Sequence, residues 1–350
     1  MANQSQAAVE RAIETRRERV NRALPEELPD TEPERLYEAT RYLLEAGGKR
    51  LRPTIVLLVA ESLADADVDP ETVDYRSFPP GVAEEETMDI MKAAVSVEVI
   101  QSFTLIHDDI MDDDDLRRGV PAVHREYDLS TAILAGDTLY SKAFEAMSET
   151  GADPERAVRA VGELASTCTK ICEGQSLDID FESRDAVAPD EYLEMVELKT
   201  AVLYAASASI PARLMGDPEA AESLYGYGLD VGRAFQIQDD LLDLTTPSEK
   251  LGKQRGSDLV EGKQTLVTLH ARQQGVDVDD LVDTESVEAV DEAEIEAAVE
   301  RLREAGSIEF ARETAQDLVA SGKANLEVLP DNEARARLDD IADYLIEREY

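Results

Sequence analysis

The sequence contains few residues of several types, and each scarcity narrows the class of protein. Only two of the 350 residues are cysteine, none is tryptophan, and aromatic residues make up 5%. The two cysteines, Cys168 and Cys172, are too few for a disulfide framework, and no further cysteine or histidine pair accompanies them to form a zinc site. We interpret them as two small apolar side chains. The core must therefore consist of Leu, Ala, Val and Ile, and a hydrophobic content of 43% is enough to build one.

Long hydrophobic runs are also missing. The longest run, residues 55–60, falls far short of the ~20 apolar residues that a membrane-spanning helix needs. Residues 1–24 are amphipathic and mixed in charge, without the apolar centre of a signal peptide. The sequence therefore predicts a cytoplasmic protein with no membrane span.

Basic residues are scarce as well. The chain has 35 Lys and Arg against 77 Asp and Glu, which gives a formal net charge of -42. A surface this acidic repels nucleic acid and anionic membranes, so neither is expected as a partner. Most of the basic residues are arginine. An acidic, lysine-poor surface is typical of proteins adapted to high salt, where self-repulsion is screened, and we hypothesise a halophilic source.

The hydrophobic pattern predicts an all-α protein. Nearly every segment has the helical period, and alternating strand patterns are essentially missing. Residues 65–86 and 277–291 are acidic and weakly patterned, and we expect surface loops there. No internal repeat or interdomain linker is visible, so we predict a single large helical bundle over residues 1–350. The predicted helices cover residues 7–24, 33–46, 53–64, 87–111, 130–149, 154–173, 189–215, 218–244, 292–303, 307–320 and 332–348.

Two helices carry a conflict between burial and charge. Residues 87–111 and 224–244 are apolar around much of their circumference, which is typical of helices at the centre of a bundle. Each nevertheless ends in the spacing Asp-Asp-x-x-Asp, at 108–112 and at 239–243. The first and last carboxylates of this spacing lie one helical turn apart on one face. They repel each other, and the helix dipole opposes negative charge at this end, so a cation must compensate.

An all-oxygen ligand set without His or Cys suits Mg²⁺, which commonly bridges one or two carboxylates to substrate phosphates. A solvated acidic face would explain one such cluster equally well. A solvated acidic face is a poor explanation for two such clusters, each at the end of a helix with the pattern of a buried one.

The basic residues gather in polar motifs. Residues 47–53, Gly-Gly-Lys-Arg-Leu-Arg-Pro, form a tight turn with three cations that can present donors to a phosphate. Arg117 and Arg118 follow the first aspartate cluster, and Lys253 and Lys263 follow the second. Taken singly, each is explained as a surface charge, and Lys199 within its apolar helix as a snorkelling side chain. Taken together they predict two phosphate sites, one of them free of metal.

In this order, the motifs resemble those of the trans-isoprenyl diphosphate synthases. The resemblance runs from residues 47–53 to Lys263 and includes Leu-Arg-Arg-Gly at 116–119, Lys-Thr at 199–200, Phe-Gln-Ile-Gln-Asp-Asp-Leu-Leu-Asp at 235–243 and Gly-Ser-Asp at 256–258. It implies an isoprenoid synthase bundle with a central cavity, and about three Mg²⁺ ions per active site. It also implies a homodimer.

The resemblance further implies a role for each matching residue. Asp108, Asp112 and Asp239 would bind metal, with Asp109 and Asp243 in support. The full predicted metal set is Asp108, Asp109, Asp112, Asp239, Asp240 and Asp243. The predicted contacts of the allylic diphosphate are Arg117, Lys199, Lys253 and Lys263. Those of isopentenyl diphosphate are Lys49, Arg52, Gln101, Arg118 and Phe235. The predicted catalytic residues are Lys199, Thr200 and Gln236.

The implied reaction is the head-to-tail (1′-4) condensation of isopentenyl diphosphate with allylic diphosphates of C5, C10 or C15, for isoprenoid lipid biosynthesis. Mg²⁺ and the cations neutralise the leaving diphosphate, so that the allylic carbon–oxygen bond ionises. Apolar walls and the dipoles of Thr200 and Gln236 protect the carbocation. The double bond of isopentenyl diphosphate attacks it, and the released diphosphate takes the proton. We interpret His107 as a polar residue at a helix end.

Product length is expected to depend on Phe103 and Thr104, which form the pocket floor in the family. At a rise of ~1.5 Å per residue they lie about 6–8 Å deeper along the helix than Asp108. One bulky ring beside a small residue predicts a stop at moderate depth. The first motif also lacks the two-residue insertion of many bacterial farnesyl enzymes. This pattern resembles archaeal geranylgeranyl diphosphate synthases and predicts a C20 product, with C15 and C25 as alternatives.

Two other functions remain open. A class I terpene cyclase would share the metal and the bundle, but such enzymes usually carry an Asn/Ser/Glu metal motif and need no site for isopentenyl diphosphate. A non-catalytic partner subunit of a heteromeric synthase tends to have degraded aspartate motifs, whereas both motifs are intact here. A di-iron bundle is disfavoured because no Glu-x-x-His pair occurs.

Overall fold

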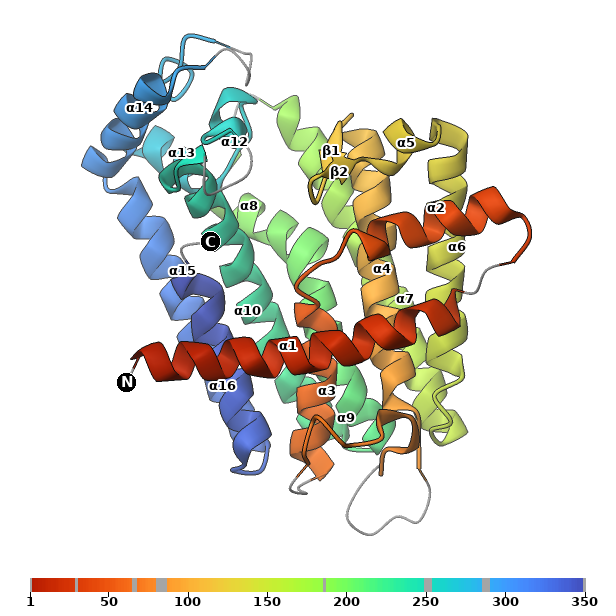
Figure 1. Ribbon diagram of the computed structural model, residues 1–350. Coiled ribbons are helices and arrows are strands. Elements are labelled where there is room, and N and C mark those ends of the chain that lie inside the picture. Colours follow the sequence, from red (N-terminus) through yellow and green to blue (C-terminus); the bar gives the residue numbers. More distant parts are fainter. Residues whose placement is uncertain are drawn as a thin grey trace. The chain divides into compact units, whose positions relative to one another are not determined.

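The computed structural model describes residues 2–28, 31–64, 68–79, 87–184, 187–248, 254–284 and 290–348. The prediction of an all-α protein is confirmed, because helices make up most of the described chain (Figure 1). The helices are α1 (Ala2–Glu27), α2 (Glu34–Glu45), α3 (Leu51–Ala64), η1 (Tyr75–Ser77), α4 (Ile90–Met111), α5 (Val123–Glu126), α6 (Leu129–Ser148), α7 (Pro154–Glu182), α8 (Pro189–Val196), η2 (Glu197–Ala201), α9 (Val202–Met215), α10 (Pro218–Thr245), α12 (Ser257–Val260), α13 (Leu266–Gln273), α14 (Glu292–Glu304), α15 (Ser307–Ala324), η3 (Asn325–Val328) and α16 (Glu333–Glu347).

The chain divides into two compact units. Unit 1 comprises Met1–Cys168, Ala206–Tyr225 and Leu326–Asp340. Unit 2 comprises Thr169–Ala205, Gly226–Asn325 and Ile341–Tyr350. The first aspartate cluster belongs to unit 1 and the second to unit 2.

Unit 1 is organised around α4. Apart from the half-buried Lys92, every side chain in the first half of α4, residues 90–100, is buried, as the apolar pattern of this segment predicts. The helix packs against α3 and α6, and α1 crosses α3 and α4 (Figure 1). The Asp89 side chain caps its first turn by accepting a hydrogen bond from the Lys92 N–H at 3.1 Å. A rigid, buried helix therefore carries the first aspartate cluster at its end.

Length and composition alone would allow α4 to cross a membrane, and it is the one helix in the described part of the chain that meets these criteria. Most of it is buried inside the protein. The central helix of a folded domain meets the same criteria, so this finding adds no evidence for a span.

Unit 2 contains a feature that the sequence pattern did not predict. The five residues of η2 form a π-helical segment between α8 and α9, where one continuous helix over 189–215 was expected. Wide turns of this kind are rare and are frequent at functional sites. Around it, α13 packs against α8 and α15, and α14 packs against α15.

Several other short elements were missed, among them α5 and α12. A two-residue strand, β1 (Leu116–Arg117), pairs antiparallel with β2 (Val120–Pro121) through a turn at Arg118 and Gly119. Strands this short leave no alternating pattern in a sequence. The helix α13 lies in a stretch where no helix was predicted. The expected loops at 65–86 and 277–291 fall partly outside the described residues.

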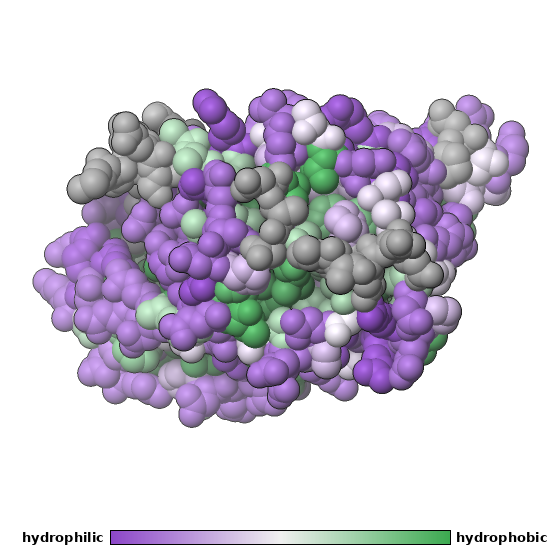
Figure 2. Space-filling model, turned by 90° about the horizontal axis from the view of Figure 1, so that it is seen from below, coloured by the Kyte–Doolittle hydropathy of each residue, from purple (hydrophilic) through white to green (hydrophobic). Residues whose placement is uncertain are grey.

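The surface reflects the composition. Figure 2 shows hydrophilic side chains over most of one face, with smaller hydrophobic areas between them. With 77 acidic and 35 basic residues, fewer than half of the acidic side chains can have a basic partner of their own. The surface therefore carries a net repulsion that dissolved salt would screen.

Candidate active site

The first aspartate cluster lies where α4 ends. The helix ends at Met111, and the N–H of Asp112 donates to the carbonyl of Asp108 at 2.8 Å. Asp108 is half-buried and Asp112 is exposed, whereas Asp109 is fully buried. The first and last carboxylates of the motif therefore reach solvent on one side of α4, and the second turns inward.

Arg117 of β1 binds the inward carboxylate. Its Nε donates to Asp109 Oδ1 at 2.6 Å, and it pairs with Asp114 at 2.8 Å. Burial raises the pKa of Asp109, and the hydrogen bond and charge of Arg117 oppose that rise. Burial lowers the pKa of Arg117, but the hydrogen bond to Asp109 and the charges of this and neighbouring aspartates raise it by more. A supporting aspartate thus anchors a predicted diphosphate contact to the metal motif.

Arg118 lies against the glycine turn before α3. It donates to the carbonyl of Gly47 and, at 3.3 Å, to that of Leu43. Gly48 has a φ of +142°, and a Cβ there would lie 3.0 Å from Arg118 Cζ. Glycine is required both for this backbone conformation and for the close approach of the guanidinium group. The structure therefore brings residues 47–53 together with residues 116–119.

Several guanidinium groups gather at this turn. Burial lowers the pKa of Arg118, the charge of Glu98 opposes this, and the charges of Arg50, Arg117 and Arg52 lower it further. Arg50 is itself buried and pairs with Glu98 of α4, with side chains 1% and 4% exposed. Guanidinium groups this close repel one another, and a bound anion would relieve the repulsion.

The backbone at these motifs is unusual. Arg50, Asp113 and Arg118 have φ values of 51°, 55° and 54°, and they are the non-glycine residues with positive φ in the described part of the chain. Such conformations cost about 1–3 kcal/mol each and persist where the surroundings hold them. Arg50 is held by its bonds to the Leu44 carbonyl at 2.6 Å and to Asn21 at 2.9 Å. Strain confined to the predicted motifs supports a functional site here.

The predicted pocket floor is part of a row of aromatic side chains in contact between α4 and α6. Phe103 meets His107 edge-on at 4.9 Å and Tyr140 at 5.2 Å, and Tyr140 meets Phe144 at 4.9 Å, all between ring centroids. Tyr140 and Phe144 were missed because no motif shows which face of α6 lies toward α4.

The other predicted residues on this part of α4 already have local contacts. Thr104 Oγ1 donates to the carbonyl of the half-buried Gln101 at 2.9 Å. His107 Nε2 lies 3.3 Å from the carbonyl of Ile133, and a Cβ at Gly136 would overlap the His107 ring. Gly136 therefore makes room for this ring, which supports a packing role for His107.

The second aspartate cluster lies near the end of α10. The Asp239 side chain is 40% exposed, whereas Asp240 and Asp243 are 6% and 2% exposed. Asp243 accepts hydrogen bonds from Ser257 Oγ at 2.9 Å and from the N–H of Asp258 at 3.1 Å, and so fixes the start of α12. The second motif thus exposes one carboxylate, where the first exposes two.

Asp239 pairs with Arg348. The Arg348 guanidinium lies over the Phe235 ring, 4.4 Å from its centroid, and the Arg348 carbonyl accepts from Gln238 Nε2 at 3.3 Å. Sequence reasoning missed Arg348 because no motif marks it. A guanidinium on this carboxylate competes with a metal ion for the same oxygen atoms.

Lys199 and Thr200 lie in the π-helical turn η2. Lys199 Nζ donates to Asp178 of α7 at 2.5 Å. Gly174 of α7 meets η2 so closely that a Cβ there would lie 2.7 Å from Lys199 Cα. Thr200 Oγ1 instead donates to Gln236 Oε1 on α10 at 3.1 Å. The turn therefore directs two adjacent predicted residues toward different helices.

Asp240 is the most perturbed carboxylate of the second motif. Its Oδ1 accepts from Gln236 Nε2 at 3.0 Å, and its Oδ2 accepts from the Tyr192 hydroxyl. Burial raises the pKa of Asp240 to about 8 and the charge of Asp258 adds to the rise, against the effect of these two hydrogen bonds. Tyr192 is a site residue that sequence reasoning missed, because a lone tyrosine on a helix gives no signal.

The structure describes three of the four remaining predicted contacts. Lys253 lies outside the described residues. Lys263, with its side chain 51% exposed, pairs with Asp258 at 3.5 Å. At the start of α3, Lys49 is exposed and Arg52 is half-buried.

The carboxylates fit an open magnesium site. In the described ranges no three His, Cys, Asp or Glu side chains converge on one point. Mg²⁺ keeps several waters and is usually bound by one or two carboxylates plus substrate phosphates, so a closed protein cage is not required. Asp109 Oδ2 is a further acceptor at this end of α4, buried and without a hydrogen-bond partner among the residues described.

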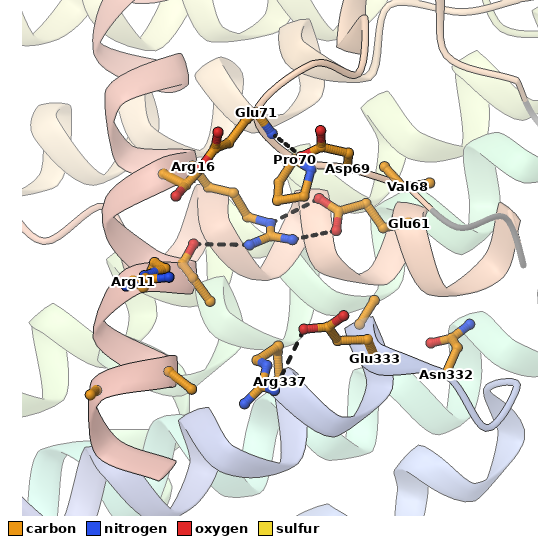
Figure 3. Close-up of a pocket in the computed structure, with 15 residues that line it drawn as sticks. Arg11, Arg16, Glu61, Val68, Asp69, Pro70, Glu71, Asn332, Glu333 and Arg337 are labelled. Atoms are coloured by element: carbon orange, nitrogen blue, oxygen red, sulfur yellow. Dashed lines mark hydrogen bonds and ion pairs between the residues drawn. The ribbon is translucent and has the colours of Figure 1, made fainter. Parts of the chain in front are cut away.

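A separate pocket of about 700 Å³ in unit 1 contains none of the predicted site residues. Figure 3 shows Arg16 of α1 reaching across it to Glu61 of α3, with Nε at 2.8 Å. The Tyr75 hydroxyl also donates to Glu61, at 2.6 Å. These buried groups tie α1 to α3, and we interpret them as structural.

The helical fold and the aspartate motifs define a class, the all-α prenyltransferases. A family model described as polyprenyl synthetase matches residues 33–302. The chain belongs to the polyprenyl synthetase family, and it is a short-chain trans-prenyl diphosphate synthase. This confirms the family resemblance seen in the motifs.

Relatives differ in the product that their names state. The chain is 69% identical over 345 residues to a geranylfarnesyl diphosphate synthase of Natronomonas pharaonis, covering 98% of both chains. It is 48% identical over 339 residues to a geranylgeranyl diphosphate synthase of Methanosarcina mazei, covering 97% of both. The structure of a geranylgeranyl pyrophosphate synthetase from Geoglobus acetivorans matches with a TM-score of 0.84 and 44% identity, over 96% of this chain and 99% of that one.

Proposed function

We propose that this protein is Mg²⁺-dependent and condenses isopentenyl diphosphate head to tail with allylic diphosphates of C5, C10 and C15, ending at geranylgeranyl diphosphate (C20) for isoprenoid lipid synthesis. The observation that carries the proposal is the pair of aspartate motifs near the ends of α4 and α10, which leave Asp108, Asp112 and Asp239 accessible to solvent. The cluster of guanidinium groups beside residues 47–53 supports a second, metal-free site for a diphosphate.

The metal ions would be held by the carboxylates that reach solvent, Asp108, Asp112 and Asp239. When bound, Mg²⁺ supplies positive charge that stabilises the departing diphosphate. Asp109 and Asp243 would act in support, since the first holds Arg117 and the second fixes the start of α12.

Cationic side chains would divide between the two substrates. Arg118, Lys49 and Arg52, which belong to the two segments that meet at the glycine turn, would bind isopentenyl diphosphate, together with Gln101 and Phe235. Four others would bind the allylic diphosphate: Arg117, Lys199, Lys253 and Lys263. Arg117 suits this role because Asp109 holds it beside the metal motif.

The reaction needs few groups beyond these. The allylic carbon–oxygen bond breaks as charge moves onto the bound diphosphate, and the double bond of isopentenyl diphosphate forms the new carbon–carbon bond. Thr200 and Gln236 would stabilise the carbocation with their dipoles, and Lys199 would hold the leaving diphosphate. The released diphosphate would take the proton.

A C25 product is the second candidate, because the Natronomonas pharaonis relative is named a geranylfarnesyl diphosphate synthase. The ring of Phe103, which meets Tyr140 edge-on, favours C20 because it would close the floor at that depth. The space that the pocket leaves at Phe103 would decide whether the product is C20 or C25.

The test is a product assay with the purified protein, Mg²⁺, labelled isopentenyl diphosphate and, separately, C5, C10 and C15 primers. The expected product is a C20 alcohol after dephosphorylation. A C25 product would keep the reaction and overturn the floor at Phe103. No condensation by the folded, metal-loaded protein would overturn the proposed function.

We also propose that residues 1–350 act as one cytoplasmic isoprenyl synthase domain with a central cavity, and that two copies form a homodimer. A molecular mass near twice 38.5 kDa in solution is expected. A monomer that is fully active would contradict the homodimer.

A further inference from the structure

A chain of hydrogen bonds links a buried tyrosine to the proposed catalytic dipoles. The Tyr192 hydroxyl on α8 donates to Asp240 Oδ2, and Gln236 Nε2 donates to Asp240 Oδ1 at 3.0 Å. Thr200 Oγ1 then donates to Gln236 Oε1 at 3.1 Å. Tyr192 is 2% exposed and Asp240 is 6% exposed, so water cannot readily replace either partner.

The hydrogen bonds of this series can run in only one direction. In the structure both Asp240 oxygens accept hydrogen bonds, one from Tyr192 and one from Gln236, and a glutamine amide has one donor end and one acceptor end. Asp240 therefore holds the NH₂ end of Gln236, which leaves the carbonyl end toward Thr200. If Gln236 turned over, its carbonyl would face the Asp240 carboxylate and its NH₂ group would face Thr200.

We propose that Tyr192 is a positioning residue for prenyl transfer: through Asp240 it keeps the carbonyl dipole of Gln236 directed at Thr200. The inference rests on the proposed function, in which Thr200 and Gln236 lie beside the reacting carbons. Because both Asp240 oxygens accept hydrogen bonds in a buried place, we assign Asp240 to holding Gln236 rather than to the metal ions.

This role predicts a particular kinetic signature. A dipole aimed at charge that develops in the transition state raises kcat and contributes little to substrate binding. Loss of a group that contacts the developing charge directly costs roughly 10²–10³ in kcat. Tyr192 acts two hydrogen bonds away, so its loss should cost less, about tenfold to thirtyfold in kcat, with KM for both substrates nearly unchanged.

The first variant is Tyr192→Phe, which keeps the ring and removes the hydroxyl. The matched control is Tyr75→Phe, because Tyr75 is also buried and also donates to a buried carboxylate, Glu61, outside the predicted motifs. We expect the fall in kcat in Tyr192→Phe alone, with kcat of Tyr75→Phe within about twofold of wild type. Equal kcat values in the two variants would overturn the inference.

The second variant is Asp240→Asn, whose single carbonyl oxygen can accept from only one of the two donors. Its kcat should fall at least as far as that of Tyr192→Phe, while its half-saturating Mg²⁺ concentration stays within about twofold of wild type. The double variant, Tyr192→Phe with Asp240→Asn, should have a kcat no lower than that of Asp240→Asn alone, because Tyr192 acts through Asp240. The inference would be overturned if the loss of kcat in the double variant equalled the product of the two single losses. A large rise in the Mg²⁺ requirement of Asp240→Asn would also overturn it.

Wild-type protein is assayed beside the variants. If the wild type itself forms no prenyl product, the proposed function fails and the inference fails with it. If the wild type is active and Tyr192→Phe matches it in kcat, the inference alone fails.

Discussion

The contact between Gly174 and η2 makes a sharp prediction about one added methyl group. In Gly174→Ala, the new Cβ would lie 2.7 Å from both Leu198 C and Lys199 Cα, and it would overlap the Lys199 amide nitrogen. Ordinary contacts begin near 3.4 Å. All three atoms belong to the backbone, so no side-chain rotation can relieve the overlap, and α7 or η2 must move.

The size of the effect follows from two opposing terms. Alanine in a helix interior is favoured over glycine by up to about 1 kcal/mol. Overpacking of a rigid contact typically costs about 1–3 kcal/mol. Nothing lies within 4 Å of the Cβ position at Gly162 on the same helix. Gly162→Ala therefore measures the gain in helix stability without overpacking.

The assay is urea unfolding of Gly174→Ala and Gly162→Ala beside wild type. Gly162→Ala should match or exceed the wild-type free energy of unfolding, and Gly174→Ala should fall about 1–3 kcal/mol below Gly162→Ala. The kcat of Gly174→Ala should also fall, because Lys199 and Thr200 move with η2. If the two variants are equally stable and equally active, the close approach of α7 to η2 is refuted.

Four further predictions follow from other contacts. Phe103→Ala should lengthen the prenyl product, since the proposed floor is the ring that meets Tyr140; an unchanged product length by chromatography would rule out this floor. Arg348→Ala should tighten Mn²⁺ binding roughly twofold to fivefold, measured by electron paramagnetic resonance, because an ion pair of this kind is worth up to about 1 kcal/mol and competes with the metal at Asp239. Glu98→Gln should lower the free energy of unfolding by about 3–5 kcal/mol, since it leaves the buried Arg50 charge without its partner; Glu155→Gln at the exposed pair with Arg159 is the control and should change it by less than ~1 kcal/mol. High KCl should raise the thermal midpoint, because the Debye length falls from about 10 Å at 0.1 M salt to about 3 Å at 1 M, and full stability in dilute buffer would contradict the halophilic hypothesis.

The sequence predicted most of the long helices because their hydrophobic period is strong, whereas the short helices α5, α12 and α13 were missed. The expected 87–111 and 218–244 correspond to α4 and α10, with boundaries shifted by a few residues at most. The π-helical turn η2 was missed because the side chains of residues 197–201 fit an ordinary helix. Gly174 of α7 lies against this turn, and a contact between separate helices leaves no mark in the local sequence pattern.

For the candidate site, the motifs predicted which residues matter but not how each is held. Nothing in the spacing of residues 116–119 shows that Arg117 binds Asp109 while Arg118 turns to the glycine turn. Both contacts depend on a two-residue strand pair and on a positive φ at Arg118. Tyr192 and Arg348 carry no motif at all and became visible only through their hydrogen bonds to the second aspartate cluster.

The two aspartate motifs share a spacing but not a pattern of burial, and the difference has a physical origin. The first motif lies at the very end of α4, so the last carboxylate, Asp112, projects past the helix into solvent. The second lies before the end of α10, and there the last carboxylate, Asp243, is covered by the start of α12. In both motifs the second aspartate turns inward and receives a strong donor: Arg117 in the first, Tyr192 in the second. Identical residues at identical spacing thus divide into carboxylates that reach solvent and buried carboxylates that hold neighbouring side chains. The neighbouring elements, rather than the motif itself, decide which is which.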